Sequence, residues 1–186
     1  MVFNSAEELH TFIIKKFKEE GKVQECRRLE TEVLELLNVD IAVSNKIVTD
    51  LASKFPYFFK YFAGIRLEFM RDVFAKQIKY ITKLLCNDDT TRRAYMLTFD
   101  FFWRMHDPCL LAHHFLIRER KLILNIYSRS CDYWKVFPYD LYSAVWIQRL
   151  ICDATGTSPG EIVFHVSSLH VYKDNWKEAG VTPGNR

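Results

Sequence analysis

Two segments with the composition of β-strands follow one another between residues 111 and 127, and they constrain the fold more than any other feature. Leu111–Phe115 and Lys121–Tyr127 are rich in aliphatic and aromatic side chains, and the short polar run Arg118-Glu119-Arg120 separates them. This arrangement is typical of a β-hairpin. We therefore expect two antiparallel strands here, which the chain enters from Cys109 and leaves toward Arg129.

The rest of the chain shows both helical and extended patterns. Ser5, followed by Glu7 and Glu8, indicates the start of a helix that ends near Gly21. Hydrophobic spacing and turn residues then predict helices over 47–62, 66–85 and 141–154, strands over 33–43, 94–98 and 161–171, a charged connection over 26–32 and a turn at Pro159-Gly160. This order of elements predicts an α+β fold, in which helices pack on a mixed or mostly antiparallel sheet.

Length and composition limit the possible classes of protein. The chain has 186 residues, 49% of them hydrophobic, which suits a single domain over residues 1–186. A formal charge of +3 argues against a nucleic-acid-coating protein, and no apolar run reaches the ~18 residues of a membrane span. The five cysteines form no C-x-x-C pair and no signal-peptide pattern precedes them, so we expect a cytoplasmic protein, with no metal ligands assigned.

Several polar side chains fall at the ends of the predicted strands and in the adjoining turns. Cys109 precedes the hairpin, and Arg129 and Ser130 follow it. His170 and Tyr172 lie two positions apart on a predicted strand, so both point to one face. A thiol, arginines and a His/Tyr pair in such positions can converge on a small anionic ligand.

The order and spacing of these residues resemble the thymidylate synthase family. Pro108-Cys109, the Arg-Ser-x-Asp run at 129–132, the Pro-aromatic-Asp run at 138–140 and the His-x-Tyr run at 170–172 carry the resemblance, which covers residues 77–176. Within the family, the chain is most similar to the deoxycytidylate hydroxymethylases of T-even phages. The resemblance implies a thymidylate synthase-like fold, truncated relative to the family, a pyrimidine nucleoside monophosphate as substrate and 5,10-methylenetetrahydrofolate as the one-carbon donor.

The resemblance also implies a role for each site residue. Cys109 matches the nucleophile that adds to pyrimidine C6, a reaction that suits a soft thiolate. Arg129 and Ser130 match the phosphate-binding residues of the same subunit. Arg92 and Arg93 match the pair that reaches the phosphate of the partner subunit, which implies a homodimer.

The remaining matched positions concern the sugar, the folate and the base. His170 and Tyr172 match the residues that hold the sugar hydroxyl, and Asp132 matches the folate-facing acid. Asp140 stands where thymidylate synthases have Asn. A carboxyl group can accept from the cytosine 4-amino group and, when protonated, donate to N3, so Asp140 points to a cytosine base and also suits a helix N-cap.

Three functions remain open from the sequence. The first is hydroxymethylation of cytidylate or deoxycytidylate at C5, and the second is a minimal thymidylate synthase acting on deoxyuridylate. The third is a non-catalytic nucleotide-binding protein, because the family's proton-relaying glutamate aligns with Tyr57, with Glu68 as a nearby substitute, and Lys135-Val136 replaces a folate-contacting Leu-Gly. The chain ends soon after Trp176 without the family's C-terminal lid, which favours a reaction that ends with attack by water.

Overall fold

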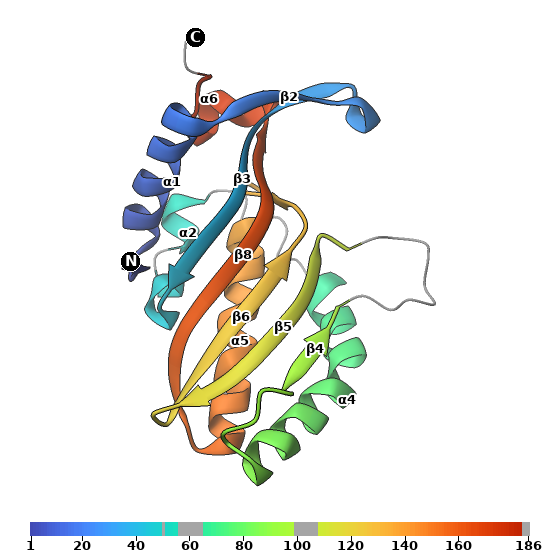
Figure 1. The fold of residues 1–186 in the computed structure, drawn as a ribbon. Helices are drawn as coiled ribbons and strands as arrows, with labels where there is room; N and C mark the ends of the chain where they lie inside the picture. The colour runs from blue at the N-terminus through green and yellow to red at the C-terminus, as the bar shows by residue number, and fades with distance from the viewer. Residues whose placement is uncertain (50, 56–64, 99–107, 184–186) are drawn as a thin grey trace.

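The computed structural model describes residues 1–49, 51–55, 65–98 and 108–183 (Figure 1). The side chains of residues 52, 53 and 65–74 are not described. The elements are β1 (Val2–Phe3), α1 (Ala6–Glu20), β2 (Lys22–Cys26), η1 (Arg27–Leu29), β3 (Thr31–Val43), η2 (Asn45–Thr49), α2 (Leu51–Lys54), α4 (Ile65–Asn87), β4 (Tyr95–Leu97), β5 (Leu110–Arg118), β6 (Lys121–Ser128), β7 (Cys131–Asp132), α5 (Phe137–Thr155), β8 (Ser158–Tyr172), η3 (Lys173–Asn175) and α6 (Trp176–Ala179).

A mixed eight-stranded sheet forms the centre of the molecule. Its order is β1-β3-β8-β6-β5-β4, with β2 paired to β3 and β7 paired to β8. The pairs β3–β8 and β5–β6 are antiparallel, whereas β6–β8 is parallel. In Figure 1 the helix α5 lies behind β6, and the face toward the viewer carries no helix among the described residues. The predicted α+β class, with helices on a mixed sheet, is confirmed.

The predicted hairpin is present as β5 and β6. Arg118 pairs with Lys121 at the turn, and Glu119 and Arg120 between them have φ values of 50° and 59°. Two successive residues with positive φ give a turn whose twist matches that of the flanking strands. The tight turn therefore fixes the register of the two strands, which pairs Leu110 with Ser128 at the open end of the hairpin.

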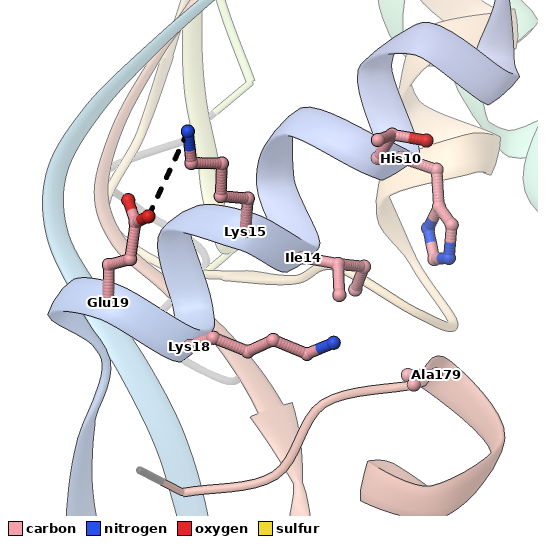
Figure 2. Close-up of a pocket in the computed structure, with 8 residues that line it drawn as sticks. His10, Ile14, Lys15, Lys18, Glu19 and Ala179 are labelled. Atoms are coloured by element: carbon pink, nitrogen blue, oxygen red, sulfur yellow. Dashed lines mark ion pairs between the residues drawn. The ribbon is translucent and has the colours of Figure 1, made fainter.

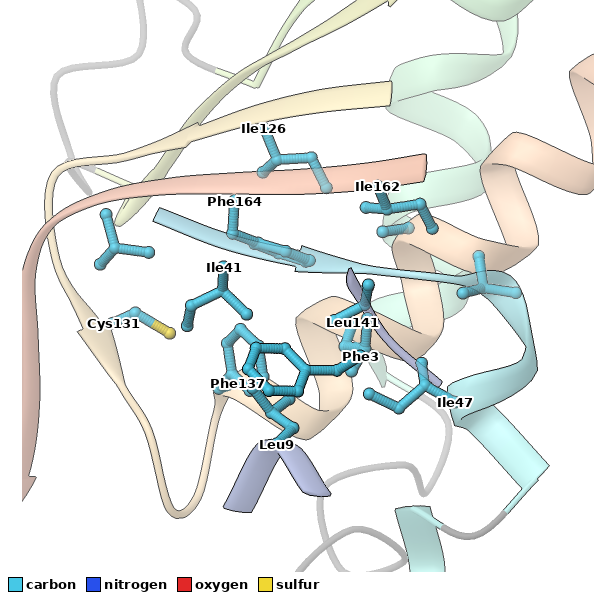
Figure 3. Packing of buried hydrophobic residues seen from close by; sticks show 14 of the residues in the cluster. Phe3, Leu9, Ile41, Ile47, Ile126, Cys131, Phe137, Leu141, Ile162 and Phe164 are labelled. Atoms are coloured by element: carbon cyan, nitrogen blue, oxygen red, sulfur yellow. The ribbon is translucent and has the colours of Figure 1, made fainter. Parts of the chain in front are cut away.

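The core lies between the sheet and the helices on its covered face (Figure 3). Ile126, Phe164 and Ile41 come from three neighbouring strands and are buried together with residues of α5. The rings of Phe137 and Phe164 meet at 5.1 Å with an interplanar angle of 60°. Burying a side chain of this size contributes about 1.5–3 kcal/mol, so these contacts stabilise the packing of α5 against the sheet.

The helix expected after Ser5 is confirmed, since the Ser5 hydroxyl accepts a hydrogen bond from the Glu8 amide at 3.2 Å and α1 ends at Glu20. The helix expected over 66–85 is confirmed as α4. The prediction for residues 47–62 is met only by η2 and α2, and its remainder falls outside the described residues.

Three local predictions are wrong. The connection expected over 26–32 instead ends β2, forms η1 and begins β3. The helix expected from Leu141 starts at Phe137, so its N-cap is Val136 and not Asp140. Pro159-Gly160 does not make a turn, because both residues belong to β8. In the described part of the chain, no helix has the length and apolar character needed to cross a membrane.

Candidate active site

Five of the residues predicted for the site line one cavity of about 480 Å³. They are Cys109, Arg129, Ser130, His170 and Tyr172. The first three come from the open end of the β5–β6 hairpin, and the last two lie near the end of β8, which is parallel to β6. Strand pairing therefore brings residues more than 60 positions apart in the chain to a common pocket whose size suits a small ligand.

The thiol is held by the segment that follows β6. The Ser130 hydroxyl lies 3.4 Å from Cys109 Sγ, in position to donate to it. The Arg129 amide donates to the Cys109 carbonyl at 2.9 Å, and Arg129 Nε donates to the Pro108 carbonyl at 3.1 Å. These contacts fix the backbone on both sides of the sulfur, so the thiol faces the cavity from a rigid support.

His170 and Tyr172 form the opposite part of the lining. Their rings meet edge to face at 5.0 Å, as expected for side chains two apart on a strand. Burial lowers the pKa of His170, although Asp132, the Ser168 backbone and Glu35 act in the opposite direction. Burial raises the pKa of the Tyr172 phenol. At neutral pH the pair therefore offers a neutral imidazole and a phenol, both able to donate to and accept from a hydroxyl.

Asp132 lies beside His170 in the β7–β8 pair but is not among the described residues that line the cavity. Its Oδ1 accepts from the backbone amides of Trp134 at 3.0 Å and Lys135 at 3.1 Å. Burial raises the pKa of this carboxyl group, and the two amides and His170 oppose the increase. These two hydrogen bonds from backbone amides fix the orientation of the Asp132 carboxyl group.

The β2–β3 arm supplies cavity residues that the sequence prediction missed. Cys26, Arg28 and Glu35 line the same cavity as Cys109. Figure 1 shows β2 and the turn after it extending over the end of the sheet near β8. The adjacent pair Arg27-Arg28 in a charged segment was the available signal, but solvent-exposed arginine pairs in connections are common. The structure shows that Arg28, in η1, lines the cavity.

Other predicted residues lie elsewhere in the described chain. Arg92 lines a separate cavity of about 310 Å³ together with Arg118 and Arg120, and Arg93 is exposed nearby. Asp140 is 7% exposed in the first turn of α5 and does not line the cavity of Cys109 as far as that lining is described. Tyr57 and the side chain of Glu68 fall outside the described residues.

A second cavity, of about 560 Å³, lies between α1 and the C-terminal end of α6 (Figure 2). Figure 2 shows Lys15 and Glu19 paired with each other along α1, at 3.8 Å. His10 also lines this cavity, and its Nδ1 lies 3.2 Å from the Tyr133 hydroxyl. Burial lowers the pKa of His10 to about 4. A neutral histidine stacked on Tyr133 anchors α1 to the core, so we assign this contact a structural role.

Comparison with known proteins agrees with this geometry. The family model described as thymidylate synthase matches residues 45–182, which is well over half of the chain. The chain belongs to the thymidylate synthase family. The match extends from η2 to beyond α6 and therefore includes every predicted site residue.

Individual members of the thymidylate synthase family show how far the similarity extends. A Methanococcoides burtonii protein named "Putative thymidylate synthase" is 31% identical over 121 residues, which are 63% of this chain and 55% of that protein. The thymidylate synthase of Bacillus phage phi3T is 27% identical over 103 residues, or 52% of this chain and 36% of that protein. The chain thus matches about half, or less, of the length of these curated relatives.

Among solved structures, thermostable thymidylate synthase A from Bacillus subtilis superposes with a TM-score of 0.72. The alignment covers 95% of this chain and 83% of that structure, at 15% sequence identity. At this level of identity the comparison establishes the fold.

Proposed function

We propose that this chain transfers a one-carbon unit to C5 of a pyrimidine nucleoside monophosphate and that the preferred reaction is hydroxymethylation of a cytidine nucleotide. The observation that carries the proposal is the convergence of Cys109, Arg129, Ser130, His170 and Tyr172 on one cavity. A nucleophile, a cation for phosphate and a hydroxyl-binding pair are the groups that such a nucleotide requires.

Cys109 supplies the nucleophile in this proposal. Its thiolate adds to C6 of the pyrimidine, and the electron pair of the C5–C6 double bond shifts toward C5, which becomes nucleophilic. With a methylenetetrahydrofolate donor bound, C5 would bond to the one-carbon unit and lose its proton, and tetrahydrofolate would leave. Addition of water to the one-carbon unit would then give the hydroxymethyl group, and expulsion of the thiolate would restore the double bond. The hydrogen bond from Ser130 to the sulfur holds Cys109 in place for both the addition and the expulsion.

The proposed donor is 5,10-methylenetetrahydrofolate, which supplies carbon at the oxidation level of formaldehyde. Asp132 is the residue assigned to it, and its surroundings fit that assignment. Both backbone amides bind Oδ1 of the carboxyl group, so Oδ2 can accept from an N–H group of a pterin. Asp132 is 8% exposed, so only a small part of its surface is open to a ligand.

Selection of the base is assigned to Asp140. Thymidylate synthases carry Asn at the matching position, and its amide suits uracil. A buried carboxyl group that retains a proton presents the reverse pattern of donor and acceptor, which suits cytosine. Asp140 is 7% exposed in the first turn of α5.

We further propose a homodimer in which Arg92 and Arg93 reach the partner's phosphate. Within one chain, Arg92 lines a cavity other than that of Cys109. The sheet face without helices also carries large exposed apolar side chains on its strands: Leu37 at 65%, Tyr95 at 44% and Leu97 at 53%. A second copy packed on this face would bury them.

A thymidylate synthase acting on deoxyuridylate is the second candidate, because the curated relatives carry that name. Release of tritium from C5-labelled nucleotides tests both candidates, with methylenetetrahydrofolate present. Release from cytidine nucleotides supports hydroxymethylation, and release from deoxyuridylate alone supports the second candidate. No release from either, with nucleotide binding retained, would show that the chain binds nucleotides without catalysis.

A further inference from the structure

Glu35 is a carboxylate in the same cavity, and the family resemblance assigns it no role. It lies on β3 directly opposite His170 in the antiparallel β3–β8 ladder. Its Oε1 accepts a hydrogen bond from the Ser168 hydroxyl at 2.5 Å. Ser168, like Glu35 and His170, lines the cavity of Cys109. Because Ser168 uses one carboxylate oxygen, the other can accept from a ligand.

The charges in the cavity restrict which part of a ligand meets Glu35. Arg28 and Arg129 provide two guanidinium groups, which attract a phosphate dianion. The Glu35 carboxylate repels the same dianion and, when ionised, can only accept hydrogen bonds. The phosphate therefore binds toward the arginines, and a neutral hydrogen-bond donor of the ligand faces Glu35.

The position of His170 indicates which hydrogen-bond donors of the ligand lie near Glu35. In the proposed function, His170 and Tyr172 hold the sugar hydroxyl. Glu35 is the ladder partner of His170, so the hydroxyl edge of the sugar lies within reach of its carboxylate. An acidic side chain on ribose hydroxyls is also how dinucleotide-binding folds recognise ribose.

We propose that Glu35 accepts hydrogen bonds from the sugar hydroxyls and thereby makes this chain selective for ribonucleotides over 2′-deoxyribonucleotides. The proposal rests on the proposed function, because it takes a pyrimidine nucleoside monophosphate as the ligand. Ribose offers vicinal 2′ and 3′ hydroxyls, whereas 2′-deoxyribose offers only one. Loss of a hydrogen bond to a charged acceptor lowers affinity by about tenfold or more.

Two substitutions separate recognition of the sugar from support of the strand. Glu35→Gln keeps a carbonyl oxygen for Ser168 but removes the charge, and Glu35→Ala removes the acceptor. Ser168→Ala is the matched control, because it removes the hydrogen bond between Ser168 and Glu35 while leaving the carboxylate in the cavity. Thermal unfolding of each variant shows whether the β3–β8 pair remains folded.

The test is calorimetric binding of CMP, dCMP, UMP and dUMP to the full chain and to these variants. We expect wild type to bind each ribonucleotide about tenfold more tightly than its deoxy counterpart. Glu35→Ala should reduce that ratio to near one, Glu35→Gln should reduce it partly, and Ser168→Ala should retain it.

Equal affinity for ribose and deoxyribose in wild type, or a ratio that survives in a folded Glu35→Ala protein, would overturn the assignment of Glu35. Tritium release from C5 in the same preparation would then still support the proposed function. Failure of all four nucleotides to bind, together with no tritium release, would overturn the proposed function and this inference with it.

Discussion

The Ser130 hydroxyl lies 3.4 Å from Cys109 Sγ, although 21 positions separate the two residues in the chain. The β5–β6 hairpin between them makes this contact possible. Its register pairs Leu110 with Ser128, and the Arg129 amide continues the pairing by donating to the Cys109 carbonyl at 2.9 Å. A shift of one residue in the hairpin would move the hydroxyl away from the sulfur, so the geometry of the thiol depends on the closure of a distant turn.

Cys109→Ser should abolish turnover while leaving nucleotide affinity within about tenfold of wild type, because the covalent bond requires the sulfur and the arginines supply much of the binding energy. Cys86→Ser is the matched control, since Cys86 is exposed and its thiol contacts the Ala154 carbonyl at 3.7 Å. Activity is measured by tritium release from C5 and affinity by calorimetry. Exchange of the C5 proton that persists in Cys109→Ser would contradict the assignment of the nucleophile.

The proposed dimer predicts complementation between two inactive variants. Arg93→Ala lacks a cation for the partner's site, and Cys109→Ser lacks its own nucleophile. In a hybrid dimer, one of the two sites combines the wild-type Cys109 of one subunit with the wild-type Arg93 of the other. When equal amounts of the two variants are mixed and exchange subunits, about a quarter of wild-type activity should return.

Subunit exchange must be verified separately, for example by native mass spectrometry of subunits of different mass. Hybrid dimers that form without any recovery of activity would show that Arg93 does not serve the partner's site. Activity in Arg93→Ala alone close to that of wild type would lead to the same conclusion.

The sequence predicted the hairpin, α4 and a strand over most of β8 because each has a strong local pattern. It failed at the start of α5, which was expected at Leu141. Proline lacks a backbone N–H, but the first turn of a helix does not need one, so α5 begins four residues earlier than expected.

The prediction of a turn at Pro159-Gly160 was wrong for a related reason. Proline can occupy the first positions of a strand, and Pro159 pairs with Leu122 there. A Cβ atom on Gly160 would lie 3.0 Å from the Leu122 carbonyl oxygen, so glycine at this position permits close pairing and does not mark a turn.

Arg28 and Glu35 of the site escaped prediction because their position depends on long-range pairing. The strand β2 is largely exposed and shows no alternation of buried and exposed residues. Glu35 lies on β3 between the buried Leu34 and Leu36, a pattern that predicts a strand but not the partner of that strand. Only the register that places Glu35 opposite His170 reveals that the carboxylate faces the cavity. The predicted residues Cys109, Arg129 and Ser130 were found because they flank a hairpin that the sequence does specify.

Stability should fall in acid because of His113. Burial lowers its pKa to about 3 in the folded chain, whereas an unfolded histidine titrates near 6.5. Above about pH 6.5 both states are neutral, and below it the unfolded chain binds a proton that the folded chain does not, so stability is lost as the pH falls from about 6.5 toward 3. Lowering the pH from 6.5 to 5 should cost on the order of 2 kcal/mol from this residue.

His113→Phe keeps a ring that can stack on Phe115, as the imidazole does at 6.3 Å, but it removes the titration. Urea unfolding of both proteins at pH 7 and pH 5 measures the difference. We expect the variant to lose less stability on acidification, with a residual dependence from His10, whose pKa is also lowered. An equal loss of stability in the two proteins would mean that the pKa of His113 does not differ between the folded and unfolded states as its burial implies.

Asp140→Asn provides the most direct test of the base. The substitution exchanges the carboxyl group for an amide of similar shape and so changes the donor–acceptor pattern that a base would meet. Each mismatched hydrogen bond in a buried position costs about 1–3 kcal/mol, so two mismatches should shift preference toward uridine nucleotides by roughly two to four orders of magnitude. Because Arg129 and Ser130 are unchanged, phosphate binding should persist.

The measurement is kcat/KM for cytidine and uridine nucleotides in both proteins, taken within the same sugar series so that the effect of the base is separated from that of Glu35. Asp140→Ala serves as the control, since it removes the acid without supplying the amide and should weaken both bases. A preference ratio that is the same in wild type and Asp140→Asn would show that Asp140 supports α5 from within the core without facing the base. The assignment of cytosine would then have to be abandoned, while Cys109 and the phosphate-binding residues would keep their proposed roles.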